Sequence, residues 1–318
     1  MDYEELRQKE LDKIIERIIS EREFPVSQRL KSLDSLEITV AGSVSYILLE
    51  VLKTEVDPNV VIHISNILAR TGDEEVVMPL VDIALGNREV HGGEDPLKEN
   101  KQQYEKVRCA IIKSLGRLKD EKAVIPLMYM LNDRNENYKV RLNAAEALGR
   151  IGDTYAVNPL INLVADEKED SIYVRESAAR ALGMLGDVRA IKPLVKILES
   201  KRGIFDKFTF LKERAIEAIA KLGGGSDRDA IKALKESLID EAPSVRLSAV
   251  EAISSMGDSS LIPILIPMVY DEEEDVSRES VRAIYSLEGH LELEKLLKDD
   301  RLPGWSRDEI ETVYNEEE

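Results

Sequence analysis

The sequence contains few of the residues from which catalytic and metal sites are usually built. Its 318 residues include one cysteine, Cys109, and three histidines, so no disulfide can form within the chain and a zinc site of Cys and His ligands is not expected. Aromatic residues make up 5% of the chain, and one of them is a tryptophan. No apolar run reaches the ~18 residues that a membrane-spanning helix requires. The chain begins with acidic residues and no apolar segment follows, so we expect no secretory leader and a cytoplasmic location.

Basic side chains are also in deficit. There are 62 acidic residues against 44 basic ones, which gives a net charge of -18. Binding to a nucleic-acid backbone depends on Lys and Arg displacing counterions, so a chain this acidic is not expected to bind nucleic acid. The same charge disfavours anionic membranes, favours solubility and weakly favours basic partners. The composition therefore leaves another protein or peptide as the expected partner.

The chain does contain a phrase that it repeats. Two close copies read VRLNAAEALGRIGD from Val140 and VRESAARALGMLGD from Val174, and looser copies begin at Val107 and Val245. An aspartate recurs after each copy, mostly at intervals of 31–34 residues: Asp73, Asp120, Asp153, Asp187, Asp227 and Asp258. Two intervals are longer, which places insertions near residues 86–103 and 199–208. A period of this length indicates an array of stacked units.

Each period predicts two helices. The aspartate is expected to cap the first helix, and a proline six residues later predicts a kink or a short irregular first turn: Pro79, Pro126, Pro159 and Pro193. The second helix carries the repeated phrase, with apolar residues at three- and four-residue steps. Glycines inside it indicate places where helices touch: Gly116, Gly149 and Gly183. Glycines at its end predict left-handed caps: Gly72, Gly152, Gly186 and Gly257.

The combined pattern D-x-x-A-[IV]-x-P-L and V-R-x-x-A-x-x-A-L-G-x-[IL]-G resembles the HEAT repeat and, more narrowly, the phycobilisome (PBS) lyase HEAT-like repeat. The resemblance covers about residues 59–289. It implies an all-α, right-handed α-α superhelix, a HEAT/armadillo-like solenoid of about seven helix pairs. It also implies that the second helices line the concave face, and that the Arg of each VR pair is structural: Arg108, Arg141, Arg175 and Arg246.

We expect three regions in one continuous solenoid. Residues 1–56 would form an N-terminal helical cap of two or three helices, residues 57–290 the repeat array and residues 291–318 a C-terminal acidic tail. We expect residues 301–318 to fray and the polar part of the first insertion, residues 91–96, to be mobile.

The sequence does not favour catalysis. Deoxyhypusine hydroxylases resemble this chain in their repeats, and that resemblance would imply irons held by His-Glu dipeptides. None of the three histidines, His63, His91 and His290, precedes a glutamate. No G-x-S-x-G elbow is present, and no Lys-Ser/Thr follows the Gly-rich residues 223–226. We therefore expect no catalytic residue, no metal and no cofactor.

Two features could form a binding site. One position on the second helix is cationic in four of the first five repeats, at Arg70, Arg117, Arg150 and Lys221. Such a column could grip an acidic peptide or a phosphate-bearing partner, although cations near a helix C-terminus are also favoured by the helix dipole. The second feature is the insertion near residue 205, which contains three of the four phenylalanines: Phe205, Phe208 and Phe210. These rings could be binding anchors or could simply pack on the adjoining helix.

Together these observations favour a noncatalytic protein-protein interaction scaffold that binds its partner along the concave face. The alternative from a different class is a phycobilin-lyase-like or chaperone-like factor that acts on a partner protein, which the resemblance to the PBS lyase repeat suggests.

Overall fold

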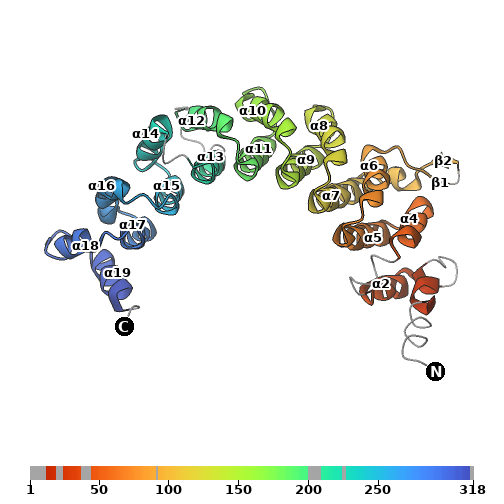
Figure 1. Ribbon diagram of the computed structural model, residues 1–318, viewed down its shortest axis with the longest axis horizontal. Coiled ribbons are helices and arrows are strands. Elements are labelled where there is room, and N and C mark those ends of the chain that lie inside the picture. Colours follow the sequence, from red (N-terminus) through yellow and green to blue (C-terminus); the bar gives the residue numbers. More distant parts are fainter. Residues whose placement is uncertain are drawn as a thin grey trace. The chain divides into compact units, whose positions relative to one another are not determined.

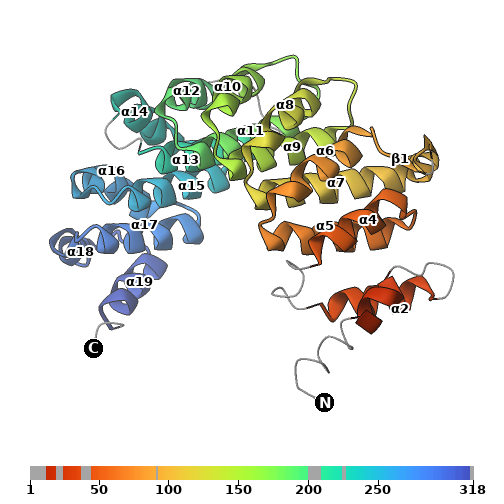
Figure 2. The same cartoon turned by 45° about the vertical axis from the view of Figure 1, so that its right-hand side comes forward.

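The computed structural model describes residues 12–18, 24–36, 44–90, 92–199, 209–223 and 227–315. The chain divides into two compact units, unit 1 with residues 1–156 and unit 2 with residues 157–318. Within each unit, helices that follow one another in sequence pack as pairs, which confirms the predicted all-α fold (Figures 1 and 2). We call the earlier member of each pair the first helix and the later member the second helix.

In unit 1, residues 12–18 are helical and precede the labelled elements. Those elements are α2 (Val26–Asp34), α4 (Ser45–Thr54), α5 (Pro58–Thr71), η1 (Glu74–Val76), α6 (Val77–Leu85), β1 (Glu89–Val90), β2 (Gly93–Glu94), η2 (Pro96–Glu99), α7 (Lys101–Leu118), η3 (Glu121–Ala123), α8 (Val124–Asn132), α9 (Tyr138–Ile151) and η4 (Thr154–Ala156). The second helices α5, α7 and α9 pack side by side and form one layer, and α2 packs against α5.

Unit 2 continues the same alternation. Its elements are α10 (Val157–Ala165), α11 (Ile172–Leu185), η5 (Val188–Ala190), α12 (Ile191–Glu199), α13 (Thr209–Lys221), α14 (Arg228–Ser237), α15 (Pro243–Ser255), η8 (Ser259–Leu261), α16 (Ile262–Leu265), η9 (Ile266–Tyr270), α17 (Glu274–Ser286), α18 (His290–Leu296) and α19 (Gly304–Asn315). Here the layer of second helices is α11, α13, α15, α17 and α19, each packed on the next.

The way in which each first helix begins explains why a proline can recur there. Asp73, Asp120, Asp187 and Asp258 each cap a single turn of 3-10 helix by accepting a backbone N–H two residues on. The α-helix begins only after that turn, so Pro79 is the third residue of α6 and lies where no N–H is needed for an α-helical bond. Of the two predicted outcomes, the irregular first turn is the one observed.

The arginine of the VR pair holds each second helix to the first helix before it. The Nε–H groups of Arg108, Arg141 and Arg175 donate to the backbone carbonyls of Ala84, Leu131 and Val164, at 2.6, 2.9 and 3.0 Å. Those carbonyls lie in the last turn of α6, α8 and α10, where no further helical N–H is available to them. The structural role predicted for these arginines is confirmed.

Glycines inside the second helices allow the helices to approach closely. A Cβ added at Gly116 of α7 would lie 2.9 Å from Cα and 3.0 Å from Cβ of Ala147 in α9. In unit 2 the same contact recurs between Gly183 and Ala218, at 3.0 and 3.1 Å. Such distances leave no room for a methyl group, so these positions require glycine, as predicted.

The first insertion is held in place by a buried ion pair, and our expectation of mobility for residues 91–96 is wrong for the residues described. The guanidinium of Arg88 donates to both carboxylate oxygens of Asp95, at 2.9 and 2.5 Å, and also to the carbonyls of Leu52 and Glu55. Asp95 is 1% exposed. The pair closes the β1–β2 hairpin onto the end of α4, whereas His91 lies outside the described residues.

The expectation that residues 301–318 fray is also wrong for residues 301–315. Residues 304–315 form α19, which buries Ile310 and Val313 and packs on α17. Arg307 donates to the carbonyl of Leu297 at 2.8 Å, in the manner of the VR arginines. The last residues, 316–318, lie outside the described part.

Candidate functional site

The second helices of unit 1 present a cationic surface that is turned away from the first helices. Helix α7 carries five basic residues against one acidic residue, Glu105, although one of the five, Arg108, bonds to Ala84 of α6 and pairs with Glu136 at 2.6 Å, so it does not belong to this surface. This is a local excess of positive charge in a chain whose net charge is -18. Arg70, Lys113 and Arg117 are all exposed. Arg70 and Arg117, two members of the predicted column, are therefore exposed on neighbouring helices, and their role in binding stays a prediction.

Arg117 lies on α7 and Arg70 on the neighbouring helix α5, and the side-chain amide of Asn66 lies near both. Nη1 of Arg117 donates to Oδ1 of Asn66 in α5 at 2.9 Å. Arg70 is four residues after Asn66 and Lys113 four residues before Arg117, so each pair shares a helix face. The amide orients the guanidinium without neutralising its charge.

Arg150, the next member of the column, differs from Arg117 in its partner. Its guanidinium donates to the carboxylate of Glu146 at 2.7 Å, one turn earlier in α9. Lys139 on the same helix is likewise paired with Glu105 at 2.9 Å. The positive charge of α9 is therefore largely compensated, and the surplus lies on α5 and α7.

The remaining predicted residues belong to unit 2. Lys221 is exposed at the C-terminal end of α13, and Phe210, in the first turn of that helix, is 59% exposed. Phe205 and Phe208 lie outside the described residues. The role of all these residues in binding stays a prediction.

Sequence reasoning missed an acidic surface on the second helices of unit 2. Partial burial raises the pKa of Glu251 in α15, and the nearby carboxylates of Glu279, Glu217 and Glu213 raise it further. Burial also raises the pKa of Glu176 in α11, although Arg214 opposes this shift. Glu217 and Glu251 occupy the same position of the repeat as Glu146, so the alignment of the phrases could have revealed this acidic row.

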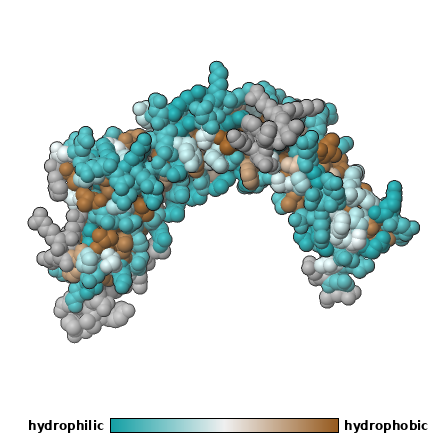
Figure 3. All heavy atoms as spheres, turned by 180° about the vertical axis from the view of Figure 1, so that it is seen from behind, coloured by the Kyte–Doolittle hydropathy of each residue, from teal (hydrophilic) through white to brown (hydrophobic). Residues whose placement is uncertain are grey.

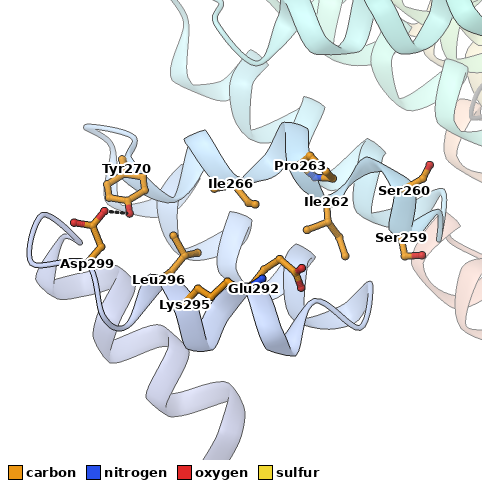
Figure 4. A pocket seen from close by; sticks show the side chains of 10 residues that line it. All are labelled: Ser259, Ser260, Ile262, Pro263, Ile266, Tyr270, Glu292, Lys295, Leu296 and Asp299. Atoms are coloured by element: carbon orange, nitrogen blue, oxygen red, sulfur yellow. Dashed lines mark hydrogen bonds between the residues drawn. The ribbon is translucent and has the colours of Figure 1, made fainter.

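A shallow groove of about 450 Å³ lies on the first-helix side of unit 2 (Figure 4). Its lining residues are Ser259, Ser260, Ile262, Pro263, Ile266, Tyr270, Glu292, Lys295, Leu296 and Asp299. The first helix is interrupted here, since α16 ends at Leu265 and continues as the 3-10 helix η9, and Pro267 has no N–H with which to extend the α-helix. The floor is apolar and the rim carries both charges. At one end the Tyr270 hydroxyl donates to Asp299 at 2.8 Å.

Potential catalytic groups are few in the described part of the chain. No group of three or more His, Cys, Asp or Glu side chains in it could hold a metal ion. Burial raises the pKa of the Cys109 thiol, and Glu105 raises it further, so the thiolate form is disfavoured. His63 contacts Asp34 at 2.9 Å, and the ring of His290 packs edge-on against Tyr285.

Most of the remaining surface is hydrophilic. On the face shown in Figure 3, hydrophobic residues appear as separate patches among hydrophilic ones. The most exposed apolar side chains of unit 1 include Ile125, Tyr129 and Tyr155, at 65%, 69% and 76%. None of the helices described has both the length and the hydropathy needed to cross a membrane.

Comparison with solved structures gives the fold. The complex of CpcE and CpcF of phycocyanin lyase from Nostoc sp. PCC7120 is 21% identical, over 65% of this chain and 89% of that chain, with a TM-score of 0.42. Human deoxyhypusine hydroxylase is 16% identical over 99% of both chains, with a TM-score of 0.34. Kap121p bound to Nup53p is 12% identical over 98% of this chain and 37% of that chain, with a TM-score of 0.50. At these identities only the fold can be compared, and the Kap121p match supports a helical solenoid.

Comparison with protein families is more specific. The model of HEAT repeats matches residues 134–205 and 206–285, and the model of the PBS lyase HEAT-like repeat matches residues 107–133. No curated protein matches the sequence. The two family models together cover residues 107–285, which is more than half of the 318-residue chain. The chain therefore belongs to the HEAT-repeat proteins and carries a PBS lyase HEAT-like repeat.

Proposed function

We propose that this chain is a noncatalytic scaffold that binds another protein on its second-helix face, the exposed surface of the second-helix layer. The observation that carries the proposal is a contrast between two positions of the repeat. In α9 the phrase begins at Val140, and the residue eight positions later, Leu148, is buried. Every second helix from α5 to α17 has a buried Leu or Ile at this position: Leu68, Leu115, Leu148, Leu182, Ile219, Ile253 and Ile284. The framework is therefore uniform from one pair to the next.

The position two residues earlier is exposed or half-buried in each of these helices, and its charge varies. It is occupied in order by Asn66, Lys113, Glu146, Arg180, Glu217, Glu251 and Arg282. A regular backbone that presents different polar groups from one repeat to the next offers a surface that can be specific for one partner, because charge complementarity distinguishes partners. The structure of Kap121p bound to Nup53p is consistent with binding by a fold of this kind.

Site-specific photo-crosslinking tests the proposal. A photoreactive residue would replace Lys113 on the second-helix side, or Ile125 on the first-helix side of the same unit. Both positions are exposed, so the two variants should fold equally well. We expect a defined partner protein from the source organism to crosslink at position 113 and not at position 125. Crosslinking of that partner at position 125 alone would contradict the proposal.

A second candidate is a phycobilin-lyase-like or chaperone-like action on the partner, and the match of residues 107–133 to the PBS lyase HEAT-like repeat favours it. It predicts that the captured partner carries a tetrapyrrole, or acquires one only when this chain is present. The absorption spectrum of the partner, made with and without this chain, distinguishes the two candidates.

A further inference from the structure

We propose that the surface formed by α5 and α7 binds an acidic peptide segment of the partner protein, and that Arg70, Lys113 and Arg117 are the contacting residues. This inference rests on the proposed scaffold function and specifies the kind of partner at one part of the second-helix face. It also separates these three cations from Arg150 and Lys221, which the sequence had placed in the same column.

The three cations form one site because α5 and α7 pack side by side. The hydrogen bond between Arg117 and Asn66 shows which turns of the two helices face each other here. Arg70 lies one turn beyond Asn66 on α5, and Lys113 one turn before Arg117 on α7. An extended segment that crosses the two helices could therefore place successive carboxylates against all three side chains.

The charges of these residues are available to a ligand. Among the described residues no carboxylate pairs with Arg70, Lys113 or Arg117, whereas Lys139 and Arg150 on the adjacent α9 are each paired with a glutamate. A guanidinium has five N–H donors. The bond to Asn66 uses one donor and limits the motion of the side chain, which leaves others for a carboxylate of the partner.

Charge complementarity indicates an acidic occupant. The exposed Arg70, Lys113 and Arg117 make this surface cationic. The rest of the chain is strongly acidic, so it repels anions at long range, and only a segment with several closely spaced carboxylates would gain enough at short range to bind. The same field disfavours a long polyanion such as nucleic acid, whose charges extend beyond the site.

The test compares two arginines at the same repeat position. The probe is a fluorescein-labelled ten-residue peptide of alternating Glu and Ser. A neutral peptide of alternating Gln and Ser, in which each Glu is replaced by Gln, is the reference, and binding is followed by anisotropy at low salt. Arg117→Gln and Arg150→Gln remove the same charge from neighbouring helices, but only Arg150 is neutralised by a carboxylate already. We expect Arg117→Gln to weaken binding about tenfold and Arg150→Gln to change it less than about twofold.

Three results would overturn the inference: no binding of the Glu peptide above the Gln peptide, equal losses in the two variants, or binding only when the serines are phosphorylated. These outcomes are separate from failure of the scaffold function. If the partner still crosslinks at position 113 while Arg117→Gln has no effect on its affinity, the scaffold stands and the acidic segment is excluded. If the partner crosslinks only at position 125, the scaffold proposal itself fails.

Discussion

Lys119 occupies a left-handed backbone conformation that most of the other repeats give to glycine, with Glu288 after α17 as a second exception. The φ of Lys119 is +56°, and the corresponding residues Gly152 and Gly186 have φ values of +86° and +72°. A side chain in this left-handed region costs about 1–2 kcal/mol. Glycine lowers that cost but makes the unfolded chain more flexible. We therefore expect Lys119→Gly to stabilise the protein by about 0.5–1 kcal/mol, seen as a higher urea midpoint.

Gly152 provides the matched control, because nothing lies within 4 Å of a Cβ placed there. Gly152→Lys should lower the midpoint through the backbone alone. If Lys119→Gly lowered the midpoint as well, the backbone explanation would be incorrect.

Gly116 tests how closely the second helices of unit 1 pack. Alanine favours the helix by up to ~1 kcal/mol over glycine, but its methyl group would clash with Ala147. Overpacking usually costs about 1–3 kcal/mol, so we expect Gly116→Ala to be destabilising on balance. Adding Ala147→Gly should restore part of the loss in thermal denaturation, whereas additive losses would show that the two residues do not meet.

The roles of single residues were predicted best, because the same residue recurs at the same position of each repeat. Asp caps, glycine caps and the VR arginines recur at fixed positions, so their roles followed from local chemistry. Glu146 precedes Arg150 by four residues, so their pairing within α9 could have been predicted from the sequence, whereas the bond from Arg117 to Asn66 joins two helices and could not. That difference depends on which side chain the neighbouring turn or helix supplies.

At the level of elements, the hairpin after α6 depends on one buried pair. Asp95→Ala would leave the guanidinium of Arg88 buried with its carboxylate partner removed, which typically costs about 3–5 kcal/mol. Residues 89–97 should then exchange their amide hydrogens much faster. Lys122→Ala breaks an exposed pair with Glu74 and should leave both stability and exchange nearly unchanged. Unchanged exchange in Asp95→Ala would show that the pair does not hold the hairpin.

The acidic side chains of α13, α15 and α17 predict an unusual pH dependence. Burial and the neighbouring carboxylates raise the pKa of Glu251 in the folded state, so its ionisation lowers stability as the pH rises above its ordinary value of 4.5. Glu251→Gln removes that loss. We expect a higher thermal midpoint for this variant at pH 7 and no difference from the wild type near pH 3, where both side chains are neutral.

Glu309 in α19 should show the opposite sign. Burial raises the pKa of its carboxyl, but the hydrogen bonds from Arg278 and Arg282 outweigh burial and lower the pKa overall. Its ionised form therefore adds stability that is lost as the pH falls through the folded-state pKa. Glu309→Gln should lower the thermal midpoint at pH 7. The same sign of change in both variants would contradict this reading of the pKa shifts.

Elements outside the repeated phrase were predicted less well than those within it. The phrase gave the second helices and the turn before each first helix, because caps and apolar spacing are local signals. The polar composition of residues 91–96 and the acidic residues near the C-terminus suggested disorder, since the partners that order them are distant in sequence. Arg88 bonds to the carbonyl of Leu52, and Ser306 of α19 to that of Val269.

For the whole molecule, net charge is a poor guide to the binding surface. A value of -18 suggests a basic partner, yet the second helices of unit 1 carry the surplus of cations and those of unit 2 carry closely spaced carboxylates. The sequence predicted the family and the cationic column. It could not show which side chains pair between helices, and those pairs define the proposed site.

The central claim is that a partner protein binds the second-helix face. Amide hydrogen exchange of the complex with the partner captured by crosslinking tests it most directly, because every helix is compared in one experiment. The account predicts slower exchange on binding in the exposed turns of second helices, including residues 113–117 of α7, with first helices such as α8 unchanged. Protection confined to the first helices would contradict it.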